Sequence, residues 1–273
     1  RLVFSKLHAK LGGRLKAAIS GGAPLAPEIA EFLMAIGLRV YEGYGLSETS
    51  PVLTANHPHA TKIGTVGKAW PGVELKIVPE PDRERDGEIL AKGPGIMMGY
   101  FKKPEATAEV FDPEGWFRTG DIGYIDDEGF LHITDRKKEL IKTAGGKYVA
   151  PQPIENALKI HPLVEQAVVI GDRRKYCVAL VVPKFDQLKN KLGRDLPADR
   201  SELNNDPQAR SLLQEAFDQV NQNLGAWEQI KYFRLLPREM TQETGELTPT
   251  LKVKRRIVED KYARLIDSMY SPG

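Results

Sequence analysis

The pattern of hydrophobic and polar positions changes along the chain. Residues 27–36 have apolar side chains at helical spacing, which predicts a short helix ended by Gly37, and residues 38–41 follow as a short strand. From residue 64 to residue 133 the apolar runs are short and are separated by Gly, Pro and Asp. The clearest strands expected there are residues 73–78, 87–91 and 130–133. This pattern is typical of a small β-rich barrel or sandwich.

Beyond residue 135, runs with helical and strand character alternate. The expected helices are residues 154–160, 207–224 and 253–269, and the expected strands are residues 164–170 and 177–182. Residues 189–206 are polar and contain Pro197, as in a variable insertion. We therefore predict a mixed α/β (α+β) fold in two domains, residues 1–134 and 135–273, with the boundary near residues 135–138.

Composition excludes some classes of protein. Of the 273 residues, 41% are hydrophobic and 28% are charged, which is ordinary for a soluble globular protein. The formal net charge of +2 argues against a dedicated nucleic-acid-binding protein, which normally carries a strong basic excess. The single cysteine, Cys177, excludes an intrachain disulfide and lies in an apolar run, so we expect a buried strand residue. No apolar run approaches the roughly 18–20 residues that span a bilayer.

A glycine-rich motif, YEGYGLSET, occupies residues 41–49. Glycines on both sides of Tyr44 allow a tight turn and a close approach to a ligand. Tyr44 could stack on a base, and Ser47 or Thr49 could bond a phosphate. Glu48 could hold Mg²⁺. An ordinary Gly-Tyr-Gly turn between strands is an equally good interpretation of this motif alone.

A second motif, GWFRTGD, covers residues 115–121. A carboxylate such as Asp121, placed after a glycine turn, can accept two hydrogen bonds from the diol of a ribose. A Thr-Gly-Asp β-turn without a ligand is the more common use of these residues.

A basic segment with a glycine pair follows. Five basic residues fall in the stretch from Arg136 to Lys147, which also contains Gly145 and Gly146. One interpretation is a solvated charge cluster beside a glycine turn. The other is an anion-binding hinge, in which the cations meet phosphates and a ligand approaches the glycine amides.

The fourth motif, GELTPTLKVKRR, covers residues 245–256. Lys252 lies just before an expected helix, on a loop that contains Pro249. A lysine on such a loop can reach into a site and neutralise developing negative charge. The alternative is a basic helix start, which is slightly unfavourable for the helix dipole, and this local conflict favours a functional role.

In order and spacing, the four motifs resemble the adenylate-forming superfamily, which includes acyl-CoA synthetases, peptide-synthetase adenylation domains and beetle luciferases. The resemblance runs from the SGGAPL segment at residues 20–25 to Lys252. The hinge segment DRKKELIK, the later LTPTLK and the insertion between Asp186 and Gln208 most resemble long-chain fatty-acyl-CoA ligases. The resemblance implies the carboxy-terminal part of a large adenylate-forming domain with a β-rich subdomain, followed by a small mobile α/β domain.

The resemblance also implies a two-step reaction. A carboxylate attacks the α-phosphate of ATP, with Mg²⁺ present, to give an acyl-adenylate and pyrophosphate; the thiol of coenzyme A then displaces AMP. The loop residues that would line the adenine and acyl pockets are Gly21, Gly22, Ala23 and Pro24. Tyr44, between Gly43 and Gly45, would stack on adenine. Ser47 would contact the α-phosphate, and Glu48 would hold Mg²⁺.

The later motifs are implied to bind the sugar, the phosphates and coenzyme A. Asp121 would accept both ribose hydroxyls, and Arg136 would support the ribose or phosphate. Lys252 would bridge the carboxylate and the α-phosphate during adenylation, and Lys138 would be the pivot of the mobile domain. The residues that would approach coenzyme A after rotation are Gly145 and Gly146, with Lys142 and Lys147 as further contacts.

Three positions depart from the family pattern. Ser47 stands where threonine is more common, and Lys138 stands where many members have aspartate. Leu251 precedes the late lysine where most members have glycine, which leaves Lys254 as a second candidate for the catalytic lysine.

The family's Ser/Thr/Gly-rich phosphate loop has no counterpart in the chain. Because Arg1 falls inside an expected helix, we expect a portion of a longer protein, with that loop and most of the acyl tunnel before Arg1. The chain alone is then expected to adenylate poorly. Two alternatives stay open: a ligase for aryl or medium-chain acids, and a non-catalytic nucleotide-binding module of the same fold. We expect small-molecule partners (fatty acid, ATP, coenzyme A), no nucleic acid and a cytoplasmic location, with membrane association and oligomeric state left open.

Overall fold

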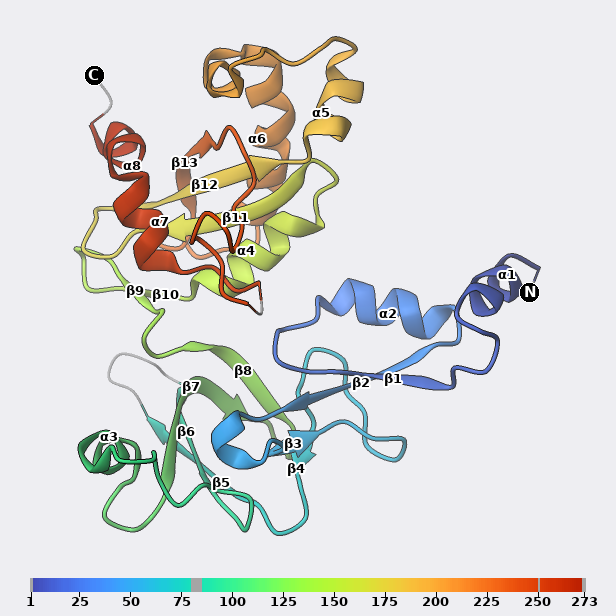
Figure 1. Ribbon diagram of the computed structural model, residues 1–273, viewed down its shortest axis with the longest axis vertical. Helices are drawn as coiled ribbons and strands as arrows, with labels where there is room; N and C mark the ends of the chain where they lie inside the picture. Colours follow the sequence, from blue (N-terminus) through green and yellow to red (C-terminus); the bar gives the residue numbers. More distant parts are fainter. Residues whose placement is uncertain (1, 80–84, 250, 272–273) are drawn as a thin grey trace. The chain divides into compact units, whose positions relative to one another are not determined.

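The computed structural model describes residues 2–79, 85–249 and 251–271, and it divides into two compact units, Arg1–Lys138 and Glu139–Gly273 (Figure 1). The division falls a few residues after the predicted position between residues 134 and 135. Asp135 and Arg136 belong to unit 1 because they still pair with strand β7 (Phe117–Ile125).

Unit 1 begins with a small mixed sheet. Helix α1 (Leu2–Lys10) precedes it, and its strands, in spatial order, are β1 (Ala17–Ser20), β2 (Arg39–Tyr44), β3 (Thr54–Ala55) and β4 (Lys68–Ala69). Strands β1 and β2 are parallel and are joined by helix α2 (Pro27–Ala35), whose first residue is a proline, a position where its missing N–H is not needed. The carboxyl ends of β1 and β2 therefore meet at one edge, the place where open α/β sheets commonly bind ligands.

The second sheet of unit 1 is an antiparallel meander. Its strands are β5 (Glu74–Pro79), β6 (Gly87–Lys92), β7 (Phe117–Ile125) and β8 (Leu131–Arg136), in that spatial order, with helix α3 (Pro104–Val110) between β6 and β7 along the chain. The three strands expected from the sequence are confirmed, and β7 is an additional strand. The strand order of this sheet is linear, and β8 also bonds the segment just before β4, since the Leu131 amide donates to the Gly67 carbonyl at 2.9 Å. The expectation of a β-rich barrel or sandwich stays a prediction.

Unit 2 is built on a three-stranded sheet with helices on both faces (Figure 1). Strand β12 (Cys177–Pro183) is central, antiparallel to β11 (Val164–Ile170) and parallel to β13 (Ile230–Leu235). Every residue of β12 is buried, which explains its unbroken apolar sequence. Cys177 is fully buried as expected, and burial raises the pKa of its thiol to about 11.

Different helices cover the two faces of this sheet. The helices on the first face are α4 (Pro151–Ile160), α5 (Phe185–Leu192) and α6 (Pro207–Asn221). The second face is covered by α7 (Arg255–Lys261) and α8 (Ala263–Tyr270). The prediction of one helix over residues 253–269 was wrong, because the backbone leaves helical geometry at Tyr262 (φ −106°, ψ 19°). The break allows Val258 on α7 and Ile266 on α8 both to reach the sheet.

Two short elements complete unit 2. Strands β9 (Ile141–Lys142) and β10 (Tyr148–Val149) form a small hairpin at its start. The predicted insertion over residues 189–206 is only partly a loop, since α5 extends into it and a 3-10 helix, η2 (Arg200–Asn205), follows. Leu203 in η2 is fully buried in the first-face core, which ties this segment to the fold.

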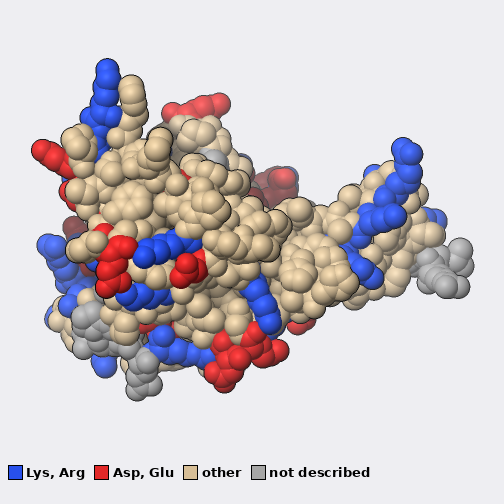
Figure 2. Space-filling model, turned by 90° about the horizontal axis from the view of Figure 1, so that it is seen from below, with Lys and Arg blue, Asp and Glu red and all other residues tan. Residues whose placement is uncertain are grey.

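Charges of both signs mix on the surface. Acidic and basic side chains lie next to one another on the face drawn in Figure 2, with uncharged surface between them, in agreement with the near-balanced composition. Among the described residues, no helix combines the length and the apolar character needed to cross a bilayer.

Candidate active site

The end of strand β2 places Tyr44 at the edge of the first sheet. Gly43 and Tyr44 pair with β3, so they are strand residues and not the Gly-Tyr-Gly turn that one interpretation of the motif gave. Gly45 follows in very close contact with the next loop, because a Cβ atom there would lie 1.5 Å from the carbonyl oxygen of Pro51. Glycine at position 45 is therefore required for the backbone to turn away from the strand.

Tyr44 and Asp121 are joined by a short hydrogen bond. The Tyr44 hydroxyl donates to Oδ2 of Asp121 at 2.6 Å, although the two residues lie far apart in sequence. Asp121 is only 3% exposed. Burial raises the pKa of the Tyr44 hydroxyl well above its ordinary value, and the negative charge of Asp121 raises it further. Tyr44 therefore stays protonated and acts as a donor to the carboxylate at any ordinary pH.

Arg136 meets the same carboxylate from the neighbouring strand. Asp121 on β7 and Arg136 on β8 are directly paired in the sheet, and the Arg136 Nε lies 3.1 Å from Oδ1 of Asp121. The alternative interpretation of TGD as a β-turn without a ligand does not match the structure: Thr119, Gly120 and Asp121 lie inside β7, where Gly120 adopts φ +71°. Strand pairing therefore orients the carboxylate, with donors at both of its oxygens.

The residues after Tyr44 form a short 3-10 helix, η1 (Ser47–Thr49). Ser47 is exposed, whereas Thr49 is 2% exposed and its hydroxyl donates to the carbonyl oxygens of Leu46 and Pro51. Thr49 is thus occupied within the loop, and of the two hydroxyls considered from the sequence only that of Ser47 is available to a ligand.

Glu48 is oriented by Tyr100, a residue that sequence reasoning missed. The Tyr100 hydroxyl donates to Oε1 of Glu48 at 3.0 Å, and the Glu48 carbonyl accepts the Met97 amide at 2.8 Å. Burial first, and then the Glu48 carboxylate, raise the pKa of the Tyr100 hydroxyl. Across the described part of the chain, no group of three or more His, Cys, Asp or Glu side chains is arranged to hold a metal ion by itself. Glu48 fits Mg²⁺ only in the usual manner of nucleotide sites, where phosphates supply most of the ligands.

The loop after β1 lies at the same sheet edge as Tyr44. Its exposed residues are Gly21, Gly22, Ala23 and Pro24. Just beyond them, the Leu25 amide donates to Oε1 of Glu42 at 3.2 Å, and Glu42 pairs with Ser20 across the two parallel strands. Burial raises the pKa of the Glu42 carboxyl, partly offset by the Leu25 hydrogen bond. Glu42 was also missed from sequence, and it fixes this loop beside β2.

The segment before the unit boundary is anchored within unit 1. The Lys137 amide donates to the Gly120 carbonyl at 2.8 Å, and the Lys137 ammonium pairs with the buried Glu88 carboxylate at 3.0 Å. Lys138, the last residue of unit 1, is exposed. Lys137 is therefore the last residue before the boundary that is bonded to the body of unit 1, and Lys138, the expected pivot, directly follows it.

In unit 2, the glycine pair lies in a tight turn closed by Thr143. The Thr143 amide donates to the Lys147 carbonyl, and the Gly146 amide donates to the Thr143 carbonyl. Gly146 has φ +78°, whereas Gly145 is exposed and has room for a Cβ atom. Lys142 lies over the Tyr148 ring, 5.0 Å from its centroid, and Lys147 lies over the Trp227 ring at 5.3 Å.

Lys252 lies on a small hairpin ahead of α7. Leu247 and Val253 pair across it, and the Thr248 amide donates to the Lys252 carbonyl at 2.8 Å. Lys252 is exposed, while Lys254 is half-buried and its amide donates to the Glu246 carbonyl at 2.7 Å. Thr250 of the predicted motif lies outside the described residues. Greater exposure favours Lys252 over Lys254 as the lysine that reaches a ligand.

Leu251 has a backbone conformation that explains why glycine is common at this position in the family. Its φ is +60° and its side chain is 68% exposed. The left-handed region costs a residue with a Cβ atom roughly 1–2 kcal/mol. Glycine avoids this cost, but it loses more conformational freedom on folding, which offsets part of its advantage. We expect Leu251→Gly to be more stable than Leu251→Ala by up to about 1 kcal/mol, measured by urea denaturation. Equal stabilities would show that the left-handed conformation is not kept in solution.

The structure thus gathers the sequence-predicted residues in separate groups. In unit 1, Tyr44 and Arg136 both contact the Asp121 carboxylate, and Ser47 and Glu48 follow Tyr44 in the same loop. Lys142, Gly145, Gly146 and Lys252 belong to unit 2.

Comparisons with known proteins identify the family of the chain. The AMP-binding enzyme model matches residues 3–101, and the AMP-binding enzyme C-terminal domain model matches residues 138–272. Long-chain-fatty-acid–CoA ligase FadD15 of Mycobacterium bovis is 45% identical over 99% of this chain and 44% of its own length. Long chain acyl-CoA synthetase 6, peroxisomal, of Arabidopsis thaliana is 38% identical over 99% of this chain and 40% of its own length. The chain spans less than half the length of these relatives.

A solved structure has the same fold. It is the A domain of carboxylic acid reductase from Segniliparus rugosus, in complex with AMP and a co-purified carboxylic acid. Its TM-score is 0.81 at 28% identity, over 98% of this chain and 41% of that chain. The two domain models together match most of the chain, in the order that the two units have along it. The chain therefore belongs to the AMP-binding enzyme family.

Proposed function

We propose that the chain is the carboxy-terminal portion of an AMP-forming long-chain fatty-acid–CoA ligase. Unit 1 is then part of the large adenylate-forming domain of that enzyme, and unit 2 is the enzyme's mobile carboxy-terminal domain. The fatty-acid substrate is proposed from the relatives, which are named long-chain acyl-CoA ligases or synthetases. AMP as a ligand is supported by the A-domain structure, which contains AMP.

The contact of Tyr44, Asp121 and Arg136 carries this proposal. A carboxylate with little exposure, oriented by a hydroxyl and a guanidinium, can accept two hydrogen bonds from a ribose diol without rearranging. The Tyr44 ring would then lie beside the adenine of the nucleotide.

Phosphate chemistry would fall to the loop after Tyr44. The exposed Ser47 hydroxyl can donate to the α-phosphate, and the Glu48 carboxylate would hold Mg²⁺ together with the phosphates of ATP. The cation would neutralise charge on the phosphates. Tyr100 keeps Glu48 in one orientation for that purpose.

Unit 2 would supply different groups to the two half-reactions. Lys252 would meet the carboxylate and the α-phosphate during adenylation, and Lys138 would be the pivot for rotation of unit 2. After rotation, the turn with Gly145 and Gly146 would approach coenzyme A, with Lys142 nearby.

The decisive experiment uses the full-length protein that contains this chain, supplied with ATP, Mg²⁺, coenzyme A and acids from C6 to C20, together with aryl acids. AMP and pyrophosphate are followed separately. We expect AMP formation that requires both coenzyme A and a long-chain acid. AMP formation with aryl or medium-chain acids would assign a different substrate class to the same chemistry. ATP binding without AMP formation with any acid would contradict a ligase and favour a nucleotide-binding module.

Replacement of Gly145 by alanine tests the proposed approach of coenzyme A. The site has room for a Cβ atom and its φ lies outside the left-handed region, so folding stability should not change. If the coenzyme approaches this backbone, the added methyl should displace it and slow thioester formation at least about tenfold. Adenylation by the same variant is the internal control and should be retained. Unchanged thioester formation, measured with supplied acyl-adenylate, would contradict the assignment.

A further inference from the structure

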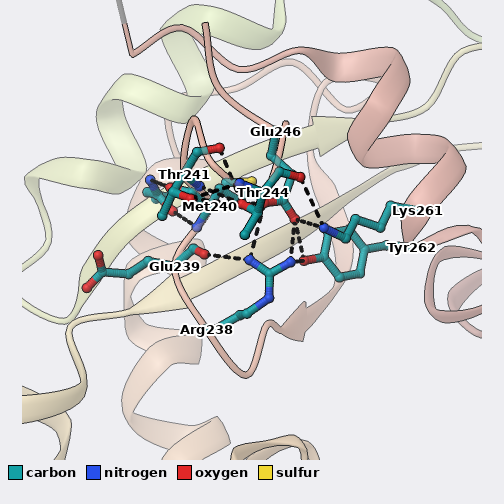
Figure 3. Close-up of polar contacts among 9 residues, drawn as sticks. Arg238, Glu239, Met240, Thr241, Thr244, Glu246, Lys261 and Tyr262 are labelled. Carbon is teal, nitrogen blue, oxygen red and sulfur yellow. Dashed lines mark hydrogen bonds and ion pairs between the residues drawn. The ribbon is translucent and has the colours of Figure 1, made fainter. Parts of the chain in front are cut away.

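Glu246 is a buried carboxylate surrounded by donors (Figure 3). Its Oε1 lies 3.0 Å from Nη2 of Arg238 and 3.1 Å from Nζ of Lys261, and it accepts the Tyr262 hydroxyl at 2.7 Å. Its Oε2 accepts the Thr244 hydroxyl and lies 3.2 Å from Nη1 of Arg238. Burial alone would raise the pKa of this carboxyl, but these hydrogen bonds outweigh it and lower the pKa to about 2. Glu246 is therefore ionised and fully satisfied at ordinary pH.

The donors to Glu246 come from two separate stretches of unit 2. Arg238 and Thr244 belong to the segment that leads from β13 to the Lys252 hairpin, whereas Lys261 and Tyr262 lie at the junction of α7 and α8. The carboxylate thus joins the two segments that flank the hairpin. It also holds Tyr262 at the point where the final helix is broken.

The backbone of Glu246 clamps the base of the hairpin as well. Its carbonyl accepts the Lys254 amide at 2.7 Å, and the next residue, Leu247, pairs with Val253. Toward the tip, the Lys252 amide donates to the Thr248 hydroxyl at 3.0 Å. Glu246 is therefore the residue at which the side-chain cluster and the paired backbone of the hairpin meet, while Lys252 itself is exposed.

We propose that Glu246 is a positioning residue for the adenylation step: its buried carboxylate fixes the base of the hairpin, where Leu247 pairs with Val253, and so holds Lys252 where it acts. This inference rests on the proposed role of Lys252. An exposed lysine has many rotamers, and a fixed backbone is what limits the volume that its ammonium samples. A misplacement of about 1 Å can cost about 10² in rate.

The test uses Glu246→Gln in the full-length protein, because glutamine keeps the shape of the side chain and removes the charge that pairs with Arg238 and Lys261. We expect adenylation, measured by pyrophosphate exchange, to slow by about 10–100-fold at saturating ATP. Thioester formation from supplied acyl-adenylate should stay within about threefold of the wild-type rate. Equal losses in both half-reactions would indicate a structural role and overturn the proposal, and so would an unchanged adenylation rate.

Two further variants make the result specific. Tyr262→Phe removes one hydroxyl donor to Glu246 and should give a smaller loss in the same half-reaction. Asp267→Asn is the matched control, because it breaks a carboxylate–arginine pair on α8, 2.7 Å from Arg174, that does not touch the hairpin. It should leave both half-reactions unchanged. A loss for Asp267→Asn equal to that for Glu246→Gln would overturn the positioning role.

Amide hydrogen exchange separates this inference from the proposed function. In Glu246→Gln, the amides of Thr248 and Lys254, which close the hairpin, should exchange at least about tenfold faster, with the β12 core unchanged. If these amides exchange faster in Glu246→Gln but Lys252→Ala adenylates at the normal rate, then Glu246 does fix the hairpin and the proposed role of Lys252 is wrong. Unchanged exchange at these amides would overturn the clamp itself.

Discussion

Lys252→Ala in the full-length protein is expected to slow adenylation by about 10²–10³ and largely to spare thioester formation from supplied acyl-adenylate. Two unit charges about 4 Å apart interact by roughly 4 kcal/mol at an effective dielectric near 20, so a single well-placed ammonium can stabilise the charge on the attacked phosphate by that order. The hairpin presents Lys252 exposed at the end of a paired backbone. Under the proposed role, that ammonium is no longer needed once the adenylate exists.

Lys254→Ala is the matched control for this prediction. Lys254 is the same residue type two positions later, but it is half-buried at the start of α7. We expect it to retain most adenylation activity. A larger loss of adenylation in Lys254→Ala than in Lys252→Ala would make Lys254 the catalytic lysine. Equal losses of adenylation and of thioester formation in Lys252→Ala would contradict the role assigned to Lys252.

Arg255→Ala is expected to destabilise the fold by about 3–5 kcal/mol near pH 7, whatever the function of the protein. Arg255 is 2.8 Å from Oε1 of Glu155, and the two side chains are 15% and 7% exposed. Arg255 also donates to the Val169 carbonyl, and the Val169 amide donates to Glu155 at 2.8 Å. Removal of the guanidinium leaves a buried carboxylate without its counter-ion, between α4 and the sheet.

The loss should depend on pH in a defined direction. Burial raises the pKa of the Glu155 carboxyl above its ordinary 4.5, and Arg255 opposes that rise, so the pKa is higher still in Arg255→Ala. When the pKa of a carboxyl is raised in the folded state, the folded protein binds the proton more tightly than the unfolded chain does. The free energy of unfolding therefore rises as pH falls through that pKa, until the carboxyl of the unfolded chain also protonates near 4.5. The destabilisation should therefore be largest at pH 7–8 and shrink as pH falls toward about 5.

Urea denaturation of Arg255→Ala across this pH range measures the effect, with Arg256→Ala as the control. Arg256 is the next residue, it is exposed, and the described residues provide it with no ion-pair partner. Its replacement should change stability by less than about 0.5 kcal/mol. A loss for Arg255→Ala that does not vary with pH would contradict the assigned cost of an unpaired Glu155.

Local sequence patterns predicted the strands whose apolar residues form a continuous run and the helices whose apolar residues recur at helical spacing. β12 was predicted because its residues are apolar on both faces, and β11 because most of its residues are apolar. α6 was predicted from its periodicity and its first-turn proline. β7 was missed because Gly120 and Asp121 have no strand propensity of their own. Pairing of Asp121 with β8 keeps the segment in the sheet, although Gly120 has φ +71° and the register with β6 shifts between Arg118 and Ile122.

The sequence by itself determined the order and spacing of the motifs and the positions of their glycines, and hence the family resemblance, since these depend on residues close together in the chain. Only the tertiary structure decided which polar groups satisfy one another. The hydrogen bond from Tyr44 to Asp121 joins two sheets, and the donors to Glu246 come from both sides of the Lys252 hairpin. A buried carboxylate is stable only where packing brings donors to it. Those donors come from segments far apart in the chain, so no local sequence pattern reveals which of them will meet.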